Sequence, residues 1–383
     1  MDKLKKRKLL ELLAAAICSI ICIKTIFAKK VNFDNFDLGN ETSSYLATVN
    51  NKPIHLTRLI TEDCNAMQTG WAERGKKNVV FILGNSQTHS INFYQQGQST
   101  FPEILTTKPE LKAFDVLTHS IPNANLQQFY LSFEYFKTKY PIKKVIVPIC
   151  PDDLRENNLN LTNFFKALVD DKFILNDKNE LALDINKSLT KLENEGNTTI
   201  DTNKLHKKVA VSNQTTQEIV EQYLNESLDK KFDFWRDREN IRGDYFVFLY
   251  KLRNTLLRIN SQTPRSIGKD LAEKNIAALA QLIESAKKDN TELYLYIPPL
   301  RVDIATPYIA KEYTSYVEEI KNLAKENSKV YFKQIDSIIP GNLWGYKAAT
   351  DYITKKDYDF MHFKALGHKI VADSITNFLT NNK

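Results

Sequence analysis

Short apolar runs alternate with longer amphipathic stretches along this chain. Apolar residues at helical spacing predict helices over Leu126–Lys139, Leu271–Lys288, Tyr308–Glu326 and Lys364–Phe378. The short runs are rich in Val, Ile, Phe and Tyr and are typical of strands buried on both faces of a parallel sheet: Val79–Leu83, Phe114–Thr118, Lys144–Ile149, Glu292–Ile297 and Val330–Ile335. Strands that alternate with helices in this way predict an α/β fold.

Two regions interrupt this alternation. Residues 29–77 are polar and irregular in pattern, which predicts a stalk leading into the fold. Residues 156–289 contain no convincing strand and place Leu and Phe at helical spacing, which predicts a mainly helical insertion between the third and fourth strands. The α/β domain would then be discontinuous, with a first part at 78–155 and a second part at 290–383.

The N-terminus predicts a membrane anchor. The first eight residues include five Lys or Arg, and Leu9–Ala28 is apolar apart from Glu11 and Lys24. A helix of this length rises about 30 Å, enough to cross a bilayer, and the basic flank favours a cytoplasmic start with the rest of the chain outside. A cleaved signal peptide and a buried N-terminal helix are the alternatives, although Ile26-Phe27-Ala28 is a poor cleavage site. We therefore expect residues 1–28 to be a retained single-pass anchor in the cytoplasmic membrane.

The composition is that of a globular protein and excludes several other classes. Of the 383 residues, 42% are hydrophobic and only 11 are glycine, which excludes collagen-like and low-complexity chains. The net charge of +7 comes from lysines interleaved with acids, and beyond the N-terminus there is no basic patch of the kind that nucleic-acid binding requires. Cys64 and Cys150 lie outside the anchor, and spacing alone does not show whether they pair. No CxxC motif or His/Cys cluster indicates a metal, and nothing indicates another cofactor.

A serine follows the first predicted strand at a glycine corner. In NVVFILGNSQTHSIN (78–92) the apolar run ends at Gly84-Asn85-Ser86. Parallel sheets bind ligands at the carboxyl ends of their strands, so Ser86 stands where a nucleophile would stand, although an ordinary turn is the alternative. A serine hydroxyl becomes a useful nucleophile only beside a base that an acid orients.

His362 is the best candidate for that base among the six histidines. It lies in DYDFMHFKALGHKI (357–370), before the last predicted helix, and Asp359 precedes it by three residues. An Asp at this offset can accept the imidazole N–H and fix the tautomer; alternatively, Asp359 caps the last helix and His362 is incidental. His89 either lines the site or lies on the surface. Cys150 lacks a dedicated base and is interpreted as a small apolar residue or half of a disulfide.

Gly84-Asn85-Ser86 together with Asp359-Phe-Met-His362 resembles the SGNH (GDSL-like) hydrolase superfamily. The resemblance covers roughly 78–155 and 290–383 and implies a flavodoxin-like three-layer fold with a parallel sheet. It also implies that Ser86 attacks an ester, that His362 is the base and that Asp359 orients it. An oxyanion hole of backbone N–H groups and an Asn side chain is expected as well.

Three positions depart from the pattern of that superfamily. Asn85 replaces the usual Asp between the Gly and the Ser. The second block, SIPNANLQQ, has no glycine and offers Asn123, Ala124 and Asn125 as oxyanion donors. The third block, VPICPDDLREN, has Asp152 near the place of the usual Asn, and an ionised Asp would repel an oxyanion.

A narrower resemblance concerns the cell envelope. A membrane anchor, an SGNH-like domain, a helical insertion and LYIPPLRVD (295–303) together resemble the D-alanylation protein of lipoteichoic acid and the SGNH-like proteins of alginate acetylation. The resemblance implies transfer of an acyl group, acetyl or D-alanyl, to hydroxyls of an envelope polymer outside the membrane, beside a multispanning membrane-bound O-acyltransferase. Arg301 would then bind a carboxylate or phosphate of the polymer or form a surface ion pair, and Trp344 and Tyr346 would line a sugar site or pack in the core.

Two alternatives to acyl transfer stay open. An envelope carbohydrate esterase would use the same residues with water as the acceptor. A catalytically inactive binding subunit of an acyltransferase complex is the other alternative, since the second and third blocks are degraded.

Overall fold

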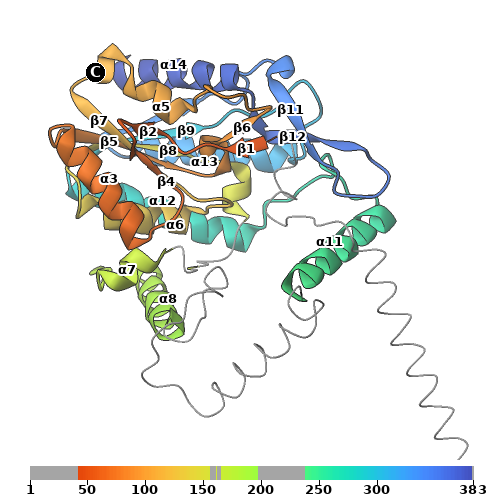
Figure 1. Cartoon of the computed structure of the whole chain (residues 1–383), viewed down its shortest axis with the longest axis horizontal. Helices are drawn as coiled ribbons and strands as arrows, with labels where there is room; N and C mark the ends of the chain where they lie inside the picture. The colour runs from red at the N-terminus through yellow and green to blue at the C-terminus, as the bar shows by residue number, and fades with distance from the viewer. Residues whose placement is uncertain (1–41, 156–160, 162–164, 197–237, 382–383) are drawn as a thin grey trace, which may run out of the picture. The chain divides into compact units, whose positions relative to one another are not determined.

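The computed structural model describes residues 42–155, 161, 165–196 and 238–381 of the chain (Figure 1). The predicted anchor at residues 1–28 lies outside these residues, as does part of the predicted insertion, residues 197–237. Among the described residues, no helix has the length and apolar character needed to span a membrane. The described residues form two compact units, a smaller one of residues 238–260 and 347–357 and a larger one of the rest.

A six-stranded parallel sheet forms the centre of the larger unit, as the sequence predicts. Its strands follow the order β10-β9-β8-β5-β7-β4. Their bounds are His55–Leu56 (β4), Asn78–Gly84 (β5), Phe114–Ser120 (β7), Ile142–Pro148 (β8), Glu292–Ile297 (β9) and Val330–Gln334 (β10). From β5 onward the order is 2-1-3-4-5, which is that of doubly wound flavodoxin-like sheets. β4 was not predicted because two residues carry no readable alternation.

Helices cover both faces of this sheet, which makes three layers (Figure 1). Along β5, Val79, Phe81 and Leu83 face one hydrophobic cluster, and Val80 and Ile82 face the other. The first cluster contains side chains of α3 (Thr61–Glu73), α6 (Leu126–Lys137), α12 (Lys269–Lys288) and α13 (Ala310–Lys325). The second contains side chains of α5 (Phe101–Thr106) and α14 (Ala365–Asn381).

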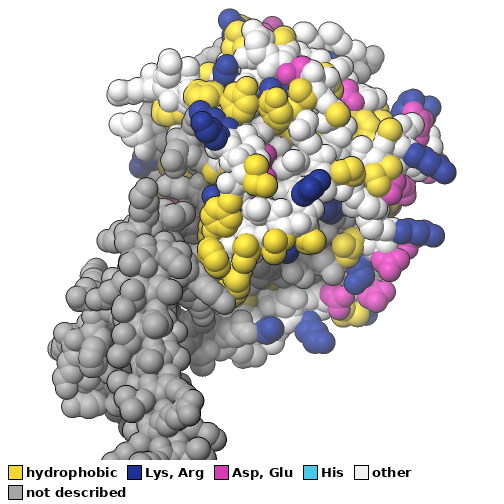
Figure 2. All heavy atoms as spheres, turned by 90° about the vertical axis from the view of Figure 1, so that its right-hand side faces the viewer, with side chains coloured by type: hydrophobic (Ala, Val, Ile, Leu, Met, Phe, Trp, Pro, Cys, Tyr) yellow, Lys and Arg dark blue, Asp and Glu magenta, His cyan; other side chains and the backbone are white. Residues whose placement is uncertain are grey.

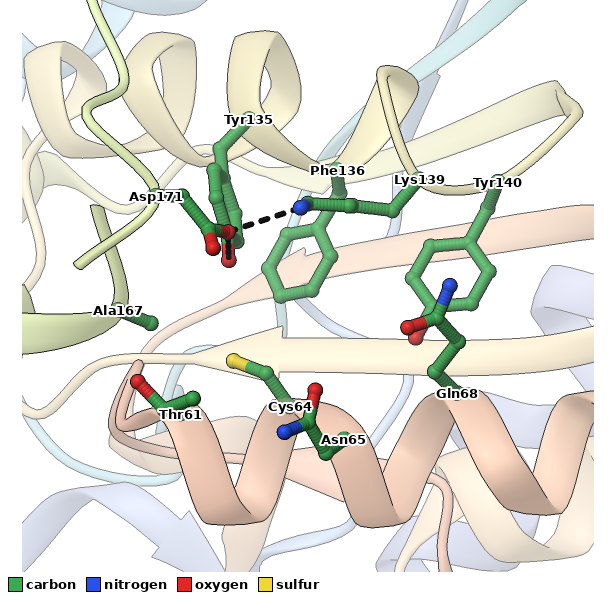
Figure 3. A pocket seen from close by; sticks show the side chains of 10 residues that line it. All are labelled: Thr61, Cys64, Asn65, Gln68, Tyr135, Phe136, Lys139, Tyr140, Ala167 and Asp171. Atoms are coloured by element: carbon green, nitrogen blue, oxygen red, sulfur yellow. Dashed lines mark hydrogen bonds and ion pairs between the residues drawn. The ribbon is translucent and has the colours of Figure 1, made fainter.

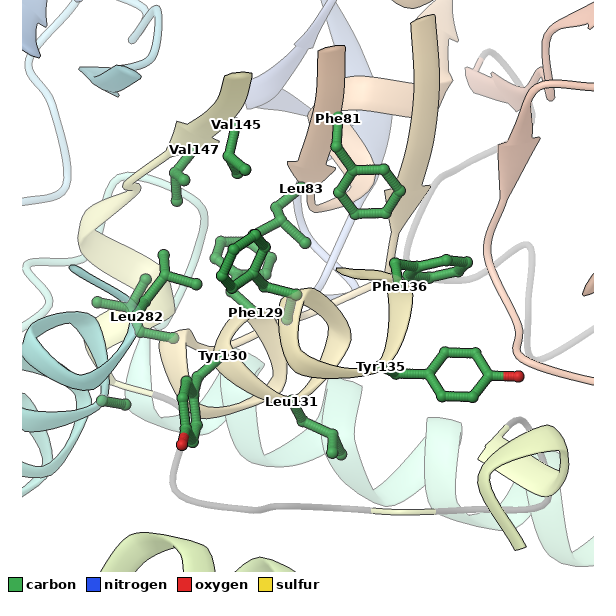
Figure 4. Packing of buried hydrophobic residues seen from close by; sticks show 14 of the residues in the cluster. Phe81, Leu83, Phe129, Tyr130, Leu131, Tyr135, Phe136, Val145, Val147 and Leu282 are labelled. Carbon is green, nitrogen blue, oxygen red and sulfur yellow. The ribbon is translucent and has the colours of Figure 1, made fainter. Parts of the chain in front are cut away.

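The larger cluster depends on aromatic side chains of α6 (Figure 4). Phe136 lies against Phe81 of β5 with ring centroids 4.8 Å apart. Phe129 and Phe136 are each 1% exposed, so each contributes about 1.5–3 kcal/mol by burial. α6 begins where Asn125 and Gln128 form a reciprocal capping box, which satisfies two N–H groups of its first turn.

The prediction of an irregular stalk at 29–77 is wrong for its described part. Residues 42–77 contain β4, α3 and three short strands, β1 (Thr42–Ser44), β2 (Thr48–Val49) and β3 (Lys52–Pro53). β1 pairs antiparallel with β6 (Ser90–Asn92), just after the catalytic candidate Ser86. The strands are too short for a pattern, and α3 buries only Met67 and Gly70 fully, which explains its polar sequence.

The described part of the predicted insertion is helical. It contains α7 (Lys166–Asp170), α8 (Glu180–Gly196), α11 (Arg238–Leu257) and α12. α12, however, packs on α6 and β9 as part of the layer that covers the sheet. The insertion therefore ends before α12.

A pair of strands precedes the last helix, where the sequence predicts none. β11 (Trp344–Ala348) and β12 (Lys356–Phe363) form a two-stranded sheet, and β12 carries both Asp359 and His362. Short turns complete the fold: α4 (Ser86–His89), η1 (Pro109–Leu111), η2 (Pro151–Leu154) and η5 (Gly341–Leu343).

Candidate active site

Ser86 lies at the carboxyl end of β5, where the strand order of the sheet reverses. Connections from β5 lead to β7 on one side, and the chain then returns across β5 to β8, which makes this end a topological switch point. Asn85 is extended and caps α4, whose first residue is Ser86. A Cβ on Gly84 would lie 2.2 Å from the Thr88 hydroxyl, so only glycine allows so tight a turn from strand to helix.

The structure brings Ser86, His362 and Asp359 together. His362 Nε2 lies 3.0 Å from Ser86 Oγ, and His362 Nδ1 lies 3.0 Å from Asp359 Oδ2. Asp359 and His362 are buried, and Ser86 is half-buried. With a proton on Nδ1, the imidazole donates to Asp359 and its Nε2 is free to accept the Ser86 proton. The order of contacts is that of a Ser–His–Asp triad.

Asp359 is held as a carboxylate by four donors. Its Oδ1 accepts the backbone N–H groups of Met361 and His362, each at 2.9 Å. Its Oδ2 accepts from His362 Nδ1 and from Asn92 Nδ2, the latter at 3.2 Å. Burial raises the pKa of Asp359, but the neighbouring His362 and these hydrogen bonds outweigh it and lower the pKa to about 2. Asp359 therefore does not cap α14, because its oxygens already accept hydrogen bonds from β12 and from Asn92 of β6.

Asn92 was missed by sequence reasoning. Its Nδ2 also donates to Thr42 Oγ1 at 2.9 Å and to the Tyr346 carbonyl at 3.0 Å, so it joins β1, β6 and β11 at the acid of the triad. A Cβ on Gly345 would lie 1.8 Å from Asn92 Oδ1, so the glycine makes room for this side chain. An Asn at the end of a three-residue strand carries no signal that separates it from a turn residue.

Gln87 was also missed, although it is the neighbour of Ser86. Its Nε2 donates to the carbonyls of Pro299 and Met361, each at 2.9 Å. This side chain ties the start of α4 to the loop after β9 and to β12. It thus holds Ser86 beside His362.

Asn85, the departure from the usual Asp, is explained by its partner. Its Nδ2 donates to Asp153 Oδ1 and to Cys150 Sγ, both at 3.1 Å, while its Oδ1 accepts from the Gln87 N–H. All three side chains are buried. A carboxylate at position 85 would face the Asp153 carboxylate, and an amide removes that repulsion.

The two cysteines outside the predicted anchor are free thiols. Burial raises the pKa of Cys150 well above its usual value, so it is a neutral side chain rather than a nucleophile. Cys64 lines a cavity of about 40 Å³ between α3, α6 and α7, with Tyr135 and Lys139 on its far wall (Figure 3). That cavity has room for one or two waters and includes no residue of the triad.

The three oxyanion candidates after β7 differ in what they already bind. This loop begins beside Ser86, because the Ile121 N–H donates to the Gly84 carbonyl at 2.9 Å. The Ala124 N–H donates to Ile121, and Asn125 exchanges hydrogen bonds with Gln128 as the cap of α6. Asn123 is exposed and has a φ of 52°, in the left-handed region. Asn123 is therefore the candidate donor that remains available.

Asp152 is committed to a structural network. It accepts from Arg155 at 2.9 Å, from Arg265 at 3.2 Å and from the Tyr308 hydroxyl at 2.8 Å. Two cations neutralise its charge, so the repulsion of an oxyanion expected at this position is offset. It contributes no donor in return.

Arg301 is buried rather than available to a polymer. Its Nη1 donates to the Gly345 carbonyl at 2.7 Å, and its Nε pairs with Asp303 at 3.0 Å. The guanidinium lies 4.7 Å from the Tyr358 ring centroid. Trp344 is likewise a core residue, and Tyr346 is half-exposed and stacks on Tyr358. Of the two predictions for Arg301, the structure shows the ion pair, although the side chain is buried and not on the surface.

His89 is buried, so the prediction that it lies on the surface is wrong. His89 Nδ1 and His55 Nε2 each lie 2.6 Å from Ser120 Oγ. Burial, with His362 and His368 nearby, lowers the pKa of His89 to about 3. These histidines are neutral and fix the end of β7 against α4. Among the described residues, no group of His, Cys, Asp or Glu side chains has the arrangement of a metal site.

Comparison with known proteins adds little to this geometry. No family model matches the sequence, and no curated protein matches it. The solved structures that match include a candidate acylhydrolase from Bacteroides fragilis, with 11% sequence identity and a TM-score of 0.37. The match covers 84% of this chain and 98% of that chain. A score this low carries no argument, so the site is interpreted from its own contacts.

Proposed function

We propose that this protein is a serine-dependent acyltransferase of SGNH type, with Ser86 as nucleophile, His362 as base and Asp359 as the group that orients the base. The continuous set of contacts from Ser86 through His362 to Asp359 carries this proposal. The position of Ser86 at the switch point of the sheet supports it.

The first step forms an ester on Ser86. As Ser86 Oγ attacks the carbonyl carbon of the donor, its proton passes to His362 Nε2 and the carbonyl π electrons move to oxygen. Asp359 stabilises the imidazolium that results, through the hydrogen bond on Nδ1. When the tetrahedral intermediate collapses, the bond to the leaving group breaks, and His362 returns the proton to the leaving atom.

The second step repeats the first with a new acceptor. His362 Nε2 takes the proton of an acceptor hydroxyl, whose oxygen attacks the Ser86 ester. Collapse releases the acylated acceptor, and Ser86 Oγ regains its proton from His362. With water as acceptor the same residues give an esterase.

We place this chemistry at the outer face of the cytoplasmic membrane. The apolar N-terminal stretch with its basic flank supports an anchor. An envelope polysaccharide or teichoic-acid-like polymer would supply the hydroxyls, and a multispanning membrane-bound O-acyltransferase would supply acetyl or D-alanyl groups. The family resemblance of the sequence supports these two assignments.

A fluorophosphonate probe tests the nucleophile, because it phosphonylates serines that a base activates. Wild-type chain should form an adduct on the peptide that contains Ser86, and Ser86→Ala and His362→Ala should not. A folded wild type that stays unlabelled would contradict the enzyme assignment. Product analysis with an added alcohol then separates transfer from hydrolysis, since a transferase forms the alcohol ester in preference to the free acid.

A second candidate function is a binding subunit without catalysis. The N–H groups of Ala124 and Asn125 already donate hydrogen bonds within the loop, so they are not available to an oxyanion. This favours the binding subunit, because loss of one oxyanion donor typically lowers kcat about 10²–10³-fold. Labelling distinguishes the two functions: an enzyme is labelled at Ser86 and loses labelling rate by about that factor in Asn123→Ala, whereas a binding subunit is not labelled in either form.

A further inference from the structure

The described side chains of helix α11 in the smaller unit, residues 246–257, include four exposed leucines. Asn254 is buried and Val247 beside it is nearly so, whereas Leu256 is 74% exposed. The other outward leucines of the helix are Leu249, Leu252 and Leu257. A helix that belongs to a soluble surface normally shows the opposite arrangement.

A rigid loop extends this apolar surface. Asp351 accepts the N–H groups of Ile353 and Thr354 at 2.9 and 2.6 Å, which fixes a turn that presents Tyr352 and Ile353 outward. Ile353 is 76% exposed, more than any of the four leucines.

The loop and the helix form one surface. Asn254 Nδ2 donates to the Thr350 carbonyl, and the Tyr352 N–H donates to Thr255 Oγ1, each at 3.0 Å. We call this the α11 surface and define it by six apolar residues: Leu249, Leu252, Leu256, Leu257, Tyr352 and Ile353.

Within residues 246–260 and 347–357, the charged side chains that are not buried are Lys or Arg. Residues 246–260 and 347–357 contain six Lys or Arg, namely Lys251, Arg253, Arg258, Lys347, Lys355 and Lys356. The two acids of these stretches, Asp351 and Asp357, are buried and accept hydrogen bonds internally. Figure 2 shows one face of the molecule, on which hydrophobic, Lys and Arg side chains are exposed together with some Asp and Glu.

We propose that the α11 surface binds the surface of a membrane that contains anionic lipids. Exposed leucines beside exposed Lys and Arg side chains are typical of segments that lie in the headgroup region. Lysine is depleted where protein meets protein, which favours lipid over a protein partner. The apolar N-terminal stretch would bring the chain to the same membrane. The proposal uses no residue of the triad, so its test is separate from that of catalysis, but it rests on the membrane placement in the proposed function.

Lipid contact is measured by the quenching of tryptophan with brominated phospholipids. Leu256→Trp and Ile353→Trp are made in the full chain and mixed with vesicles of brominated phosphatidylcholine and phosphatidylglycerol. Leu366→Trp is the matched control, an exposed leucine on α14 outside the α11 surface. The quenched emission of each variant is compared with that of the parent chain, which has three tryptophans of its own.

The proposal expects extra quenching in Leu256→Trp and Ile353→Trp and none in Leu366→Trp. Adding Lys355→Glu and Lys356→Glu to Leu256→Trp should reduce the quenching at least several-fold in these anionic vesicles. Unquenched emission at short wavelength would show that protein covers the surface, and unquenched emission at long wavelength would show that water does. Either result would overturn the proposal.

Discussion

The carboxyl end of the central sheet, where the candidate site lies, and the α11 surface depart from ordinary packing in opposite ways. At the candidate site, charged and polar side chains are buried and form hydrogen bonds. Asp359 accepts from four donors, and Asn85 donates to Asp153. At the α11 surface, leucines are exposed, and the acids nearby are the buried residues. Burial of a polar group costs free energy unless hydrogen-bond partners offset that cost. A large exposed apolar surface is also unfavourable in water, which indicates a binding partner that covers it. We infer a reaction from the first region and an interface from the second.

The largest expected effect comes from removing the charge that orients the base. Asp359→Asn places an amide where His362 Nδ1 donates, which favours the wrong tautomer, so kcat should fall about 10⁴-fold with an activated acetate ester. Asp373→Asn, an exposed carboxylate of α14, is the control and should leave kcat unchanged. If Asp359→Asn and wild type had equal kcat, Asp359 would have no role in orienting His362.

The next largest effect is expected from disruption of the Asn85–Asp153 hydrogen bond. Asn85→Asp adds a second buried carboxylate about 3 Å from Asp153 and should lower the free energy of unfolding at neutral pH by about 3–5 kcal/mol. Chemical denaturation measures the loss. Asn85→Ala removes the same hydrogen bonds without adding charge, so it should cost less, and an Asp variant as stable as the Ala variant would contradict the repulsion.

Removal of Asn92 weakens the same carboxylate more mildly. Asn92→Ala deletes one donor to Asp359, a hydrogen bond to a charged group that is worth about 1.5–3 kcal/mol, so kcat should fall about 10- to 100-fold with little change in KM. The pKa of Asp359 should rise, so activity should be lost at a higher pH on the acid side. Thr42→Val removes a different partner of Asn92 and should leave the pH profile in place.

The buried histidines predict how stability depends on pH. Burial lowers the pKa of His89, His119 and His368 to about 3. Between about pH 6.5 and 3 only the unfolded state binds these protons, so each histidine lowers stability by about 1.4 kcal/mol per pH unit as the pH falls.

His119→Gln should remove one such contribution and flatten the slope of stability against pH. Ser132→Ala removes the hydrogen-bond partner of His119 and keeps its titration, so the slope should stay. An unchanged slope in His119→Gln would show that this histidine is already charged in the fold.

The smallest effect should come from the α11 surface. Leu256→Gln should change the free energy of unfolding, measured without lipid, by no more than about 0.5 kcal/mol, because the side chain is mostly exposed. Phe136→Ala in the core should cost about 3–5 kcal/mol. A large loss in Leu256→Gln would show that the leucine packs within the protein.

The sequence predicted what depends on local periodicity. Five of the six strands of the main sheet have the predicted positions, since runs such as Val79–Leu83 are buried on both faces. The helices α6, α12, α13 and α14 follow from their apolar stripes, whereas α3 and α5 were not predicted. β4, β11 and β12 were not predicted, because two to eight residues with mixed polarity show no period.

The candidate site was predictable only where a motif marks it. Ser86, Asp359 and His362 have fixed spacing within two short motifs. Asn92, Gln87 and Asp153 act through contacts between segments distant in sequence, which no local pattern shows. Arg301 looked available because its partners, the Gly345 carbonyl and Tyr358, come from a later segment.

The most direct test of the central claim is to trap the acyl group on the serine. Wild-type chain is mixed with an activated acetate ester and quenched in acid, and its peptides are analysed by mass spectrometry. We predict one acetyl group on the peptide that contains Ser86, absent from Ser86→Ala and strongly reduced in His362→Ala. Acetyl groups on lysines alone, equal in all three proteins, would contradict a nucleophilic Ser86.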